Sequence, residues 1–477
     1  MANLSLPVLV LIAVIGLAIA LLLAWRLSKD PSFGVILIGF FLPFERIPSL
    51  DLGGFTFKIN HIVGIFTFVF WLLAVIYNRR KVAPNPLTIP LLLLFFCFLL
   101  SGLGAGNQFR AVTVYVSMLL MVVIYLAALN GLTSKRVVSL VVGAIFVSAT
   151  LMALIGIYQF FGDLAGLPTS LTGLDPGYTK AVFGFPRIHA FSKEPLYYAN
   201  YLFIPLGLSL ALFFSGKARK SKVETIKPTD SLWSKMVSRI EGPWLLPLIL
   251  LLFVNFLLTL SRGAYIALVP FALVFVIFYA RKIFTLRNII LGLLTLTISV
   301  TAAYKIIDSV SPDAIDNFLA HAELQDLFVT KTGESAFGRL EAFSQAIAAW
   351  QSSPLLGIGP GNFGPYVAYY PILTPPTGWL IVNNEYLELL AETGILGTAC
   401  FGLILVMVFI RSIIAYRKTN DDYLKAILVG LMAAFAGIFT QYNFFSTLYI
   451  IQIWVLFAFL IGVQNIVLRP KALSSTS

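Results

Sequence analysis

Repeated long apolar segments constrain this chain more than any other feature of its sequence. Many of them reach about 18 residues or more, the length of helix that crosses a bilayer. They are continuously apolar rather than alternating, which favours membrane helices over the strands of a transmembrane barrel. Of the 477 residues, 59% are hydrophobic and 11% are charged, whereas soluble proteins are about 25% charged. The sequence therefore predicts an all-α polytopic membrane protein, with residues 1–477 forming a single integral membrane domain.

The apolar segments predict about 12–13 membrane spans. They lie near residues 6–25, 33–44, 60–77, 87–104, 111–130, 137–161, 196–215, 244–260, 264–280, 288–307, 385–410, 424–441 and 447–467. The second is short and ends at Pro43, so it is either a span or a re-entrant helix. The first lacks a basic start and a clear cleavage site, which argues against a signal peptide.

Lysine and arginine are distributed unevenly between the two faces. Alternate loops, with the C-terminal segment, hold 23 of the 33 Lys and Arg residues, and the positive-inside rule places them in the cytoplasm. The most basic is the loop at residues 216–243, which we interpret as a solvated linker attracted to anionic lipid. No cytoplasmic loop contains a nucleotide-binding motif, and the net charge of +12 does not indicate nucleic acid.

Two long connections fall on the opposite, outer face. Residues 162–193 are rich in Gly, Pro and Thr, and residues 308–384 form the larger connection. Within the larger one, apolar residues recur at helical spacing over 341–350, which predicts an amphipathic helix that lies on the membrane or caps a cavity. Because the polar stretch at 334–397 is so long for a chain of this composition, we expect the function there.

Three arginines on the outer face stand in turns punctuated by Gly or Pro. Arg262 lies at the tight turn between two spans, Arg187 lies just before a span, and Arg339 opens the amphipathic helix. Each alone is compatible with an interfacial anchor whose head reaches water. Together they run against the charge bias of this face, and a guanidinium suits phosphate oxygens. We therefore expect them to bind a lipid whose diphosphate head lies at the interface.

Acidic residues follow at the start of a later span. Asn384 is placed to cap its helix, and Glu385, Glu388 and Glu392 recur at helical spacing. Carboxylates that enter a membrane are costly unless they are paired or wet. One of them is a candidate general base for a sugar hydroxyl. Salt bridges to the outer-face arginines are the alternative, and both roles are compatible.

The remaining polar candidates carry weaker signals. His189 and Glu194 share a short segment with Arg187, and a plain polar-surface role is the alternative for His189. Residues 354–362 are Gly-rich but lack a P-loop ending, which indicates a helix stop and turn whose amides can also bind an anion. The candidate substrate-binding residues are Arg187, His189, Glu194, Asn384 and Glu388. No two His residues stand at metal-ligand spacing, so we expect neither a metal nor another cofactor.

At these residues the sequence resembles the O-antigen ligase and O-antigen polymerase superfamily of bacterial membrane glycan enzymes. The stretches that carry the resemblance are residues 187–201, 259–264, 338–350, 354–363 and 384–397. The resemblance implies a helical fold like that of C-type glycosyltransferases, with a large periplasmic loop. It implies transfer of a glycan from undecaprenyl diphosphate to another sugar without a nucleotide or a required metal. It also implies that the arginines at the positions of Arg262 and Arg339 hold the diphosphate.

One position departs from the superfamily. Ligases typically have His-Asn where this chain has Asn383-Asn384, and Asn cannot act as a base near neutral pH. The resemblance implies an inverting polymerase or ligase on the periplasmic side of the bacterial inner membrane. The catalytic candidates are Arg262, Arg339, Glu385 and Asn383. The expected partners are the undecaprenyl-diphosphate-linked glycan, an acceptor glycan or lipid, membrane lipids and a chain-length regulator, without nucleic acid.

Two other functions remain open. One is a transporter, including a relative linked to inorganic-carbon uptake. Transporters often show internal repeats and polar groups near mid-membrane, whereas the polar groups here collect at one face. The other is a relative without catalytic activity, which Asn383 makes plausible. Uptake of labelled solute by liposomes, compared with sugar transfer from a lipid-linked donor, separates transport from catalysis.

Overall fold

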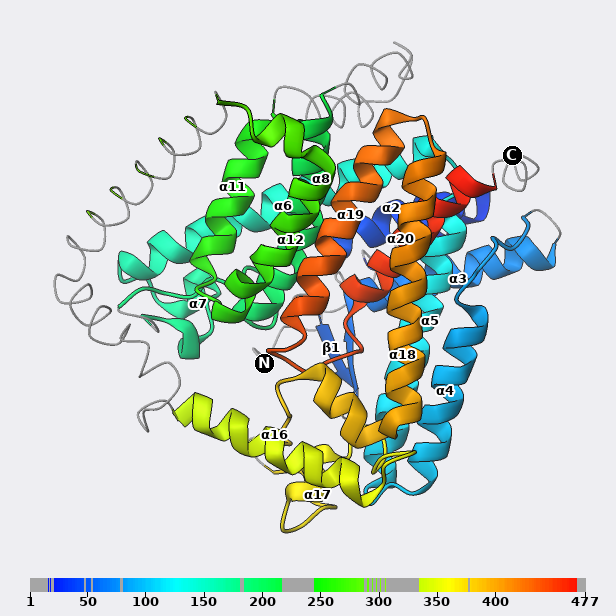
Figure 1. The fold of residues 1–477 in the computed structure, drawn as a ribbon, viewed down its shortest axis with the longest axis vertical. Coiled ribbons are helices and arrows are strands. Elements are labelled where there is room, and N and C mark those ends of the chain that lie inside the picture. The colour runs from blue at the N-terminus through cyan, green and yellow to red at the C-terminus, as the bar shows by residue number, and fades with distance from the viewer. Residues whose placement is uncertain are drawn as a thin grey trace.

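A computed structural model describes most of the chain and confirms that it is predominantly helical (Figure 1). The described residues are 21–46, 49–52, 55–77, 80–180, 184–216, 244–286, 334–375 and 378–469, with single positions at 16, 18, 290, 294, 297, 301 and 305. The predicted spans near 6–25 and 288–307 and the basic loop at 216–243 lie largely outside the described residues. Of the large outer connection, the part before Glu334 also lies outside them.

Among the described residues, eight helices are long and apolar enough to cross a membrane. They are α3 (Ile59–Ile76), α5 (Gln108–Gly131), α6 (Lys135–Leu164), α8 (Pro195–Ser215), α12 (Arg262–Ile283), α18 (Glu385–Lys418), α19 (Asp422–Gln441) and α20 (Ile451–Leu468). Three shorter apolar helices are α2 (Ser32–Phe41), α4 (Thr88–Leu103) and α11 (Leu245–Leu258). Each coincides with a predicted span, so the multi-pass, all-α architecture is confirmed. The second predicted span is the ten-residue helix α2, which is too short to cross a bilayer on its own.

A small hairpin between α2 and α3 is an addition to the predicted architecture. Strand β1 (Ser49–Leu52) pairs antiparallel with β2 (Phe55–Lys58), with Ser49 opposite Lys58. The sequence does contain a signal for it. Apolar and polar residues alternate on both sides of Gly53-Gly54, a pattern typical of hairpins, but each strand is only four residues long. A prediction based on hydropathy detects the long apolar segments on either side and misses the short strands between them.

The most buried helices lie in the middle of the bundle. Helix α19 packs against α8 and α12, and α20 packs against α5 and α18. The crossing of α8 and α19 is close because Gly207 faces Gly430, and a Cβ on either one would overlap the backbone of the other. Small residues at such crossings let membrane helices approach and gain van der Waals contact.

Loops predicted to share one side of the membrane contact one another. At the end predicted to be cytoplasmic, Arg80 pairs with Asp30 at 3.1 Å, and Lys135 pairs with Asp421. At the other end, Asn107 and Asn362 are hydrogen-bonded. We call the first the inner end and the second the outer end, following the charge-based prediction.

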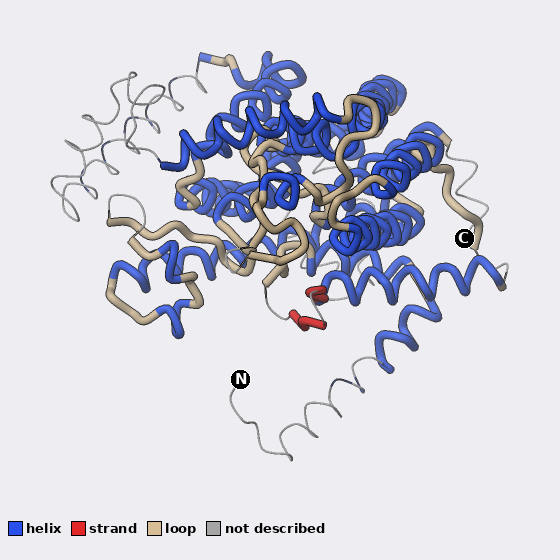
Figure 2. Tube along the Cα trace, turned by 90° about the horizontal axis from the view of Figure 1, so that it is seen from below, coloured by secondary structure: helices blue, strands red, loops and turns tan. Residues whose placement is uncertain are grey.

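Two helices of the large connection lie at the outer end, at the bottom of Figure 1. They are α16 (Glu334–Ser352) and α17 (Phe363–Val367). Helix α16 buries Ala342, Ala346 and Ala349 against residues of α17 and α18, so this face packs on protein. The predicted helix over 341–350 is confirmed, but it begins earlier. Arg339 therefore lies within α16 rather than opening it. From below, loops gather over the middle of this end (Figure 2).

Candidate functional site

Three arginines from separate segments interact electrostatically at the outer end. Arg262 is the first residue of α12, Arg187 lies in the loop before α8, and Arg339 lies on α16. Burial lowers the pKa of Arg339, and the charges of Arg262 and Arg187 lower it further. Burial also lowers the pKa of Arg187. Tyr178 acts to raise this pKa, and the charge of Arg262 lowers it further. The charge of Arg262 thus acts on both other arginines, and the charge of Arg187 acts on Arg339, effects that need like charges nearby; we call these three residues the arginine cluster.

The tight turn between α11 and α12 brings two of these arginines together. Arg187 donates from Nε to the carbonyl of Thr259 at 3.3 Å, and the backbone NH of Ile188 donates to Leu258 at 3.2 Å. The Arg187 guanidinium also lies 5.7 Å from the centre of the Tyr178 ring. The loop that carries Arg187 is thus fastened to the same turn that presents Arg262.

The other two arginines keep their hydrogen-bond donors available. Arg262 is exposed and Arg339 is half-buried. Neither donates a hydrogen bond to any residue that the structure describes. A guanidinium has five N–H donors and stays charged. Toward the residues that the structure describes, the cluster therefore has unused donors and an excess of positive charge.

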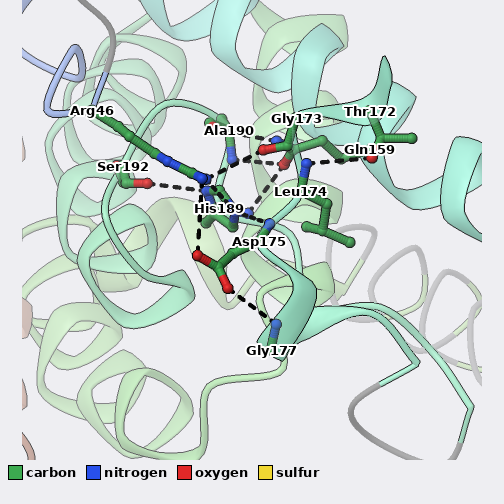
Figure 3. A network of polar contacts seen from close by, with 10 residues as sticks. All are labelled: Arg46, Gln159, Thr172, Gly173, Leu174, Asp175, Gly177, His189, Ala190 and Ser192. Atoms are coloured by element: carbon green, nitrogen blue, oxygen red, sulfur yellow. Dashed lines mark hydrogen bonds and ion pairs between the residues drawn. The ribbon is translucent and has the colours of Figure 1, made fainter. Parts of the chain in front are cut away.

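His189 is buried beneath this region with both ring nitrogens engaged (Figure 3). Its Nε2 accepts from the backbone NH of Asp175 at 3.1 Å, so the proton is assigned to Nδ1, which donates to the carbonyl of Ser192 at 3.0 Å. Burial and the charge of Arg46 lower the pKa of His189 to about 4. His189 is therefore neutral near pH 7, and its ring is committed to protein contacts.

The surrounding network holds the loop of Arg187 in place (Figure 3). Gln159 of α6 accepts from the backbone NH groups of His189 and Ala190, at 3.2 and 2.8 Å. The ring of Tyr178 packs edge-on against His189, with centroids 5.8 Å apart. Because Tyr178 also contacts Arg187, His189 supports the arginine through an intermediate ring. Sequence analysis missed Gln159, although a glutamine inside a predicted span was a usable signal.

Glu392 binds the Gly-rich segment from within the protein. Its two carboxylate oxygens accept from the backbone NH groups of Gly361, at 2.6 Å, and Phe363, at 3.0 Å. Its carbonyl accepts from Ser101 of α4 at 2.5 Å and from Gly359 at 2.9 Å. The amides at the end of the predicted turn at 354–362 do have an acidic partner, but it is a carboxyl side chain of the same chain.

Helix α18 is interrupted beside this loop. Gly394 has φ 64° and ψ −168°, a conformation that essentially only glycine adopts. The NH of Ile395, released by the break, donates to Pro354 at 3.0 Å, and a Cβ on Gly394 would overlap the carbonyl of Leu355. The span predicted near 385–410 is confirmed as α18, and the break at Gly394 is an addition to that prediction. We call Glu392, Gly394 and residues 354–363 the carboxylate junction.

The residues just before the break have distinct surroundings. Asn384 caps α18 by accepting from the NH groups of Tyr386 and Leu387 at 3.1 Å, as predicted. Asn383 precedes it in a left-handed conformation with φ 58°. Glu385 is 4% exposed. Glu388 is half-buried, and one of its oxygens accepts from Val382 at 2.8 Å.

The three glutamates therefore differ in accessibility. Glu392 is saturated by protein donors, Glu385 is buried, and Glu388 is the most accessible. Within the described residues, none of them forms an ion pair with an arginine of the cluster. Glu194, at the N-cap position of α8, acts on Arg187 through its charge.

A fourth outer-end arginine escaped the sequence analysis. Arg110, near the start of α5, donates to the carbonyl of Gly361 and lies 5.7 Å from the ring centre of Trp379. The signal that selected Arg262, an arginine at the outer start of a span, applied equally to Arg110. Its contacts place it with the carboxylate junction.

The fold and these charges define a multi-pass helical membrane protein with a polar site at one end of its bundle. Residues 247–402 match the family model described as O-antigen ligase. The match confirms the resemblance to the O-antigen ligase and polymerase superfamily, and indicates a membrane glycan ligase or polymerase. It includes Arg262, Arg339 and the three glutamates, whereas Arg187 lies outside it. No curated protein matches the chain significantly.

Proposed function

We propose that this protein transfers a glycan from undecaprenyl diphosphate to an acceptor sugar, on the periplasmic side of the bacterial inner membrane. The observation that carries the proposal is that Arg187 is hydrogen-bonded to the turn that presents Arg262, and that the charges of both act on Arg339. In the reaction, the bond between the anomeric carbon and the phosphate oxygen breaks, and the electron pair stays on the diphosphate. Preorganised positive charge that stabilises such a leaving group is often the largest catalytic term.

The three arginines have different tasks in this proposal. Arg262 and Arg339 use their free donors to bind the diphosphate oxygens, because a guanidinium matches phosphate geometry. Arg187 is already fastened to Thr259 and Tyr178, so it adds charge from a fixed position. His189 is a positioning residue for Arg187 and does not contact the substrate. Glu194 balances part of the positive charge.

We assign the acceptor side of the reaction to Glu388. It is the most accessible glutamate of the three and has one oxygen on Val382, which orients the carboxylate. It accepts the proton of the acceptor hydroxyl as that oxygen attacks the anomeric carbon from the face opposite the diphosphate, which inverts the configuration. Asn383 lies nearby in sequence and binds sugar hydroxyls through its amide. Glu385 remains the alternative base.

The proposal is tested by measuring glycan transfer from a purified lipid-linked donor to an acceptor sugar, with the protein reconstituted in nanodiscs. Arg262→Ala and Arg339→Ala are each expected to lower kcat about 10²–10³-fold, the usual cost of removing one donor to a developing anion. The Lys variants keep the charge but lose the paired donors, so they should recover only part of the rate. Arg417→Ala, an exposed residue in the last turn of α18, is the matched control. Full turnover in both Arg262 and Arg339 variants would remove the mechanism.

A further inference from the structure

The segment after α17 exposes aromatic and aliphatic side chains and carries no charge. Residues 354–384 contain no Lys, Arg, Asp, Glu or His. Within them, the exposed fractions are 89% for Tyr369, 65% for Tyr370, 79% for Ile372 and 69% for Leu373. We call residues 366–375 the aromatic lip. A soluble surface rarely keeps such a patch without a partner.

The lip is held at the outer ends of two spans. The side chain of Asn107, between α4 and α5, donates to the carbonyl of Pro371 at 2.9 Å. The same asparagine pairs through its backbone with Asn362 at 2.7 Å. On either side of Asn107, Leu103 is 72% exposed and Phe109 is 79% exposed. Because α4 and α5 are apolar helices of the bundle, we expect these exposed side chains to face lipid, and the hydrogen bond from Asn107 to Pro371 places the lip beside them.

The shape of the lip is set by packing. The rings of Tyr369 and Tyr370 meet edge-on with centroids 4.7 Å apart. Behind them, Gly364 of α17 is so close to Trp379 that a Cβ would lie 2.7 Å from the tryptophan Cβ. The exposed rings and aliphatic tips therefore project from a fixed base.

We infer that the aromatic lip inserts into the lipid interface of the outer leaflet, beside the ends of α4 and α5. Tyrosine is enriched where membrane meets water, since its ring is apolar and its hydroxyl is wet. Ile372 and Leu373 add aliphatic side chains that can enter the hydrocarbon region. Because the lip carries no charge, its insertion avoids the free-energy cost of bringing ions near the hydrocarbon. The same features recruit zwitterionic and anionic lipids alike. This contact requires no glycan transfer and is independent of the proposed reaction.

The test places a fluorescent probe on the lip. Tyr369→Cys is labelled with an environment-sensitive dye in the full-length protein, reconstituted in nanodiscs of phosphatidylethanolamine and phosphatidylglycerol. Lys180→Cys, an exposed charged position of the outer connection, is the matched control, and the unsubstituted chain gives the background from Cys97 and Cys400. Lipid spin-labelled near its head group is expected to quench the lip probe at least about twofold more than the control. Aqueous iodide should show the opposite order.

A second variant makes the outcome specific. Adding Ile372→Glu to the labelled protein puts a charge into the lip and is expected to reduce quenching by the spin-labelled lipid. Equal quenching of the Tyr369 and Lys180 probes by both reagents would overturn the inference. So would emission that changes on addition of a soluble oligosaccharide and ignores spin-labelled lipid, because that result assigns the tyrosines to sugar binding.

Discussion

The arginine cluster and the carboxylate junction lie at the same end of the molecule and use their charges in opposite ways. Arg262 and Arg339 donate no hydrogen bond to the residues that the structure describes, and their charges oppose one another. Glu392 has both oxygens filled by the backbone of the Gly-rich loop. A polar group whose hydrogen bonds are all made within the protein contributes to its stability. Like charges that repel one another lower the stability, and an anionic ligand would remove that repulsion.

The largest effect that we expect is a loss of stability on substituting Gly394, at the break in α18. Gly394→Ala combines an unfavourable backbone conformation with overlap onto the Leu355 carbonyl, at a cost of about 4 kcal/mol or more in folding free energy. Gly402→Ala, on the same helix with nothing near its added Cβ, is the control. Thermal unfolding in detergent, followed by size exclusion, measures both. Equal stability of the two variants would mean that the break in α18 is not structural.

The next effect separates activity from stability. Arg262→Ala combined with Arg339→Ala should lose less activity than the product of the two single losses, because residues that bind one group act together. The double variant should unfold at the same temperature as the wild type or higher, since two like charges no longer repel. Transfer rates and melting curves on the same preparations check both statements. Strict multiplication of the two rate losses would place the arginines in separate sites.

A smaller loss is expected from Glu392→Gln. The substituted amide keeps one acceptor, so one backbone NH of the Gly-rich loop loses its partner, at about 1–3 kcal/mol. Glu341→Gln, at an exposed position of α16, should be neutral. Denaturant unfolding compares the two variants. If Glu392→Gln is as stable as the control but inactive, Glu392 belongs to the chemistry and the contrast between the regions fails.

The smallest effect concerns the loop that supports Arg187. The pKa of His189 is lowered to about 4 in the folded state, below its unfolded value near 6.5. As pH falls below 6.5 the unfolded state takes up the proton first, so stability declines as pH falls. Between pH 6.5 and 5.5 the expected loss is about 1 kcal/mol. His189→Gln should flatten this dependence in unfolding measured across the range, and an unchanged slope in that variant would contradict the assignment.

The apolar spans were predictable because lipid requires each crossing segment to satisfy its own backbone hydrogen bonds, which makes every span a local feature. The cap at Asn384 was predictable for the same reason, since a cap uses neighbouring amides. The break at Gly394 was not predictable. The amide of Ile395 that it releases donates to the carbonyl of Pro354, in a separate segment, and no local pattern indicates that partner.

The candidate site divides in the same way. The candidate arginines are visible in the sequence: Arg262 stands at the turn between two predicted spans, and Arg339 stands near the predicted amphipathic helix of the large outer connection. Their proximity, and the separate position of Arg110 beside Gly361, depend on how distant helices pack.

Local sequence is enough to predict the apolar helices, an orientation from the charge bias, and the charged residues that stand between spans. Hydropathy and charge bias are sums over neighbouring residues, so both can be evaluated from the sequence without a structure. Which charged side chains bind groups of the protein itself depends on how the chain folds. A hydrogen bond such as that between Glu392 and Gly361 joins residues from separate segments, and its existence depends on the distance that the folded chain sets between them.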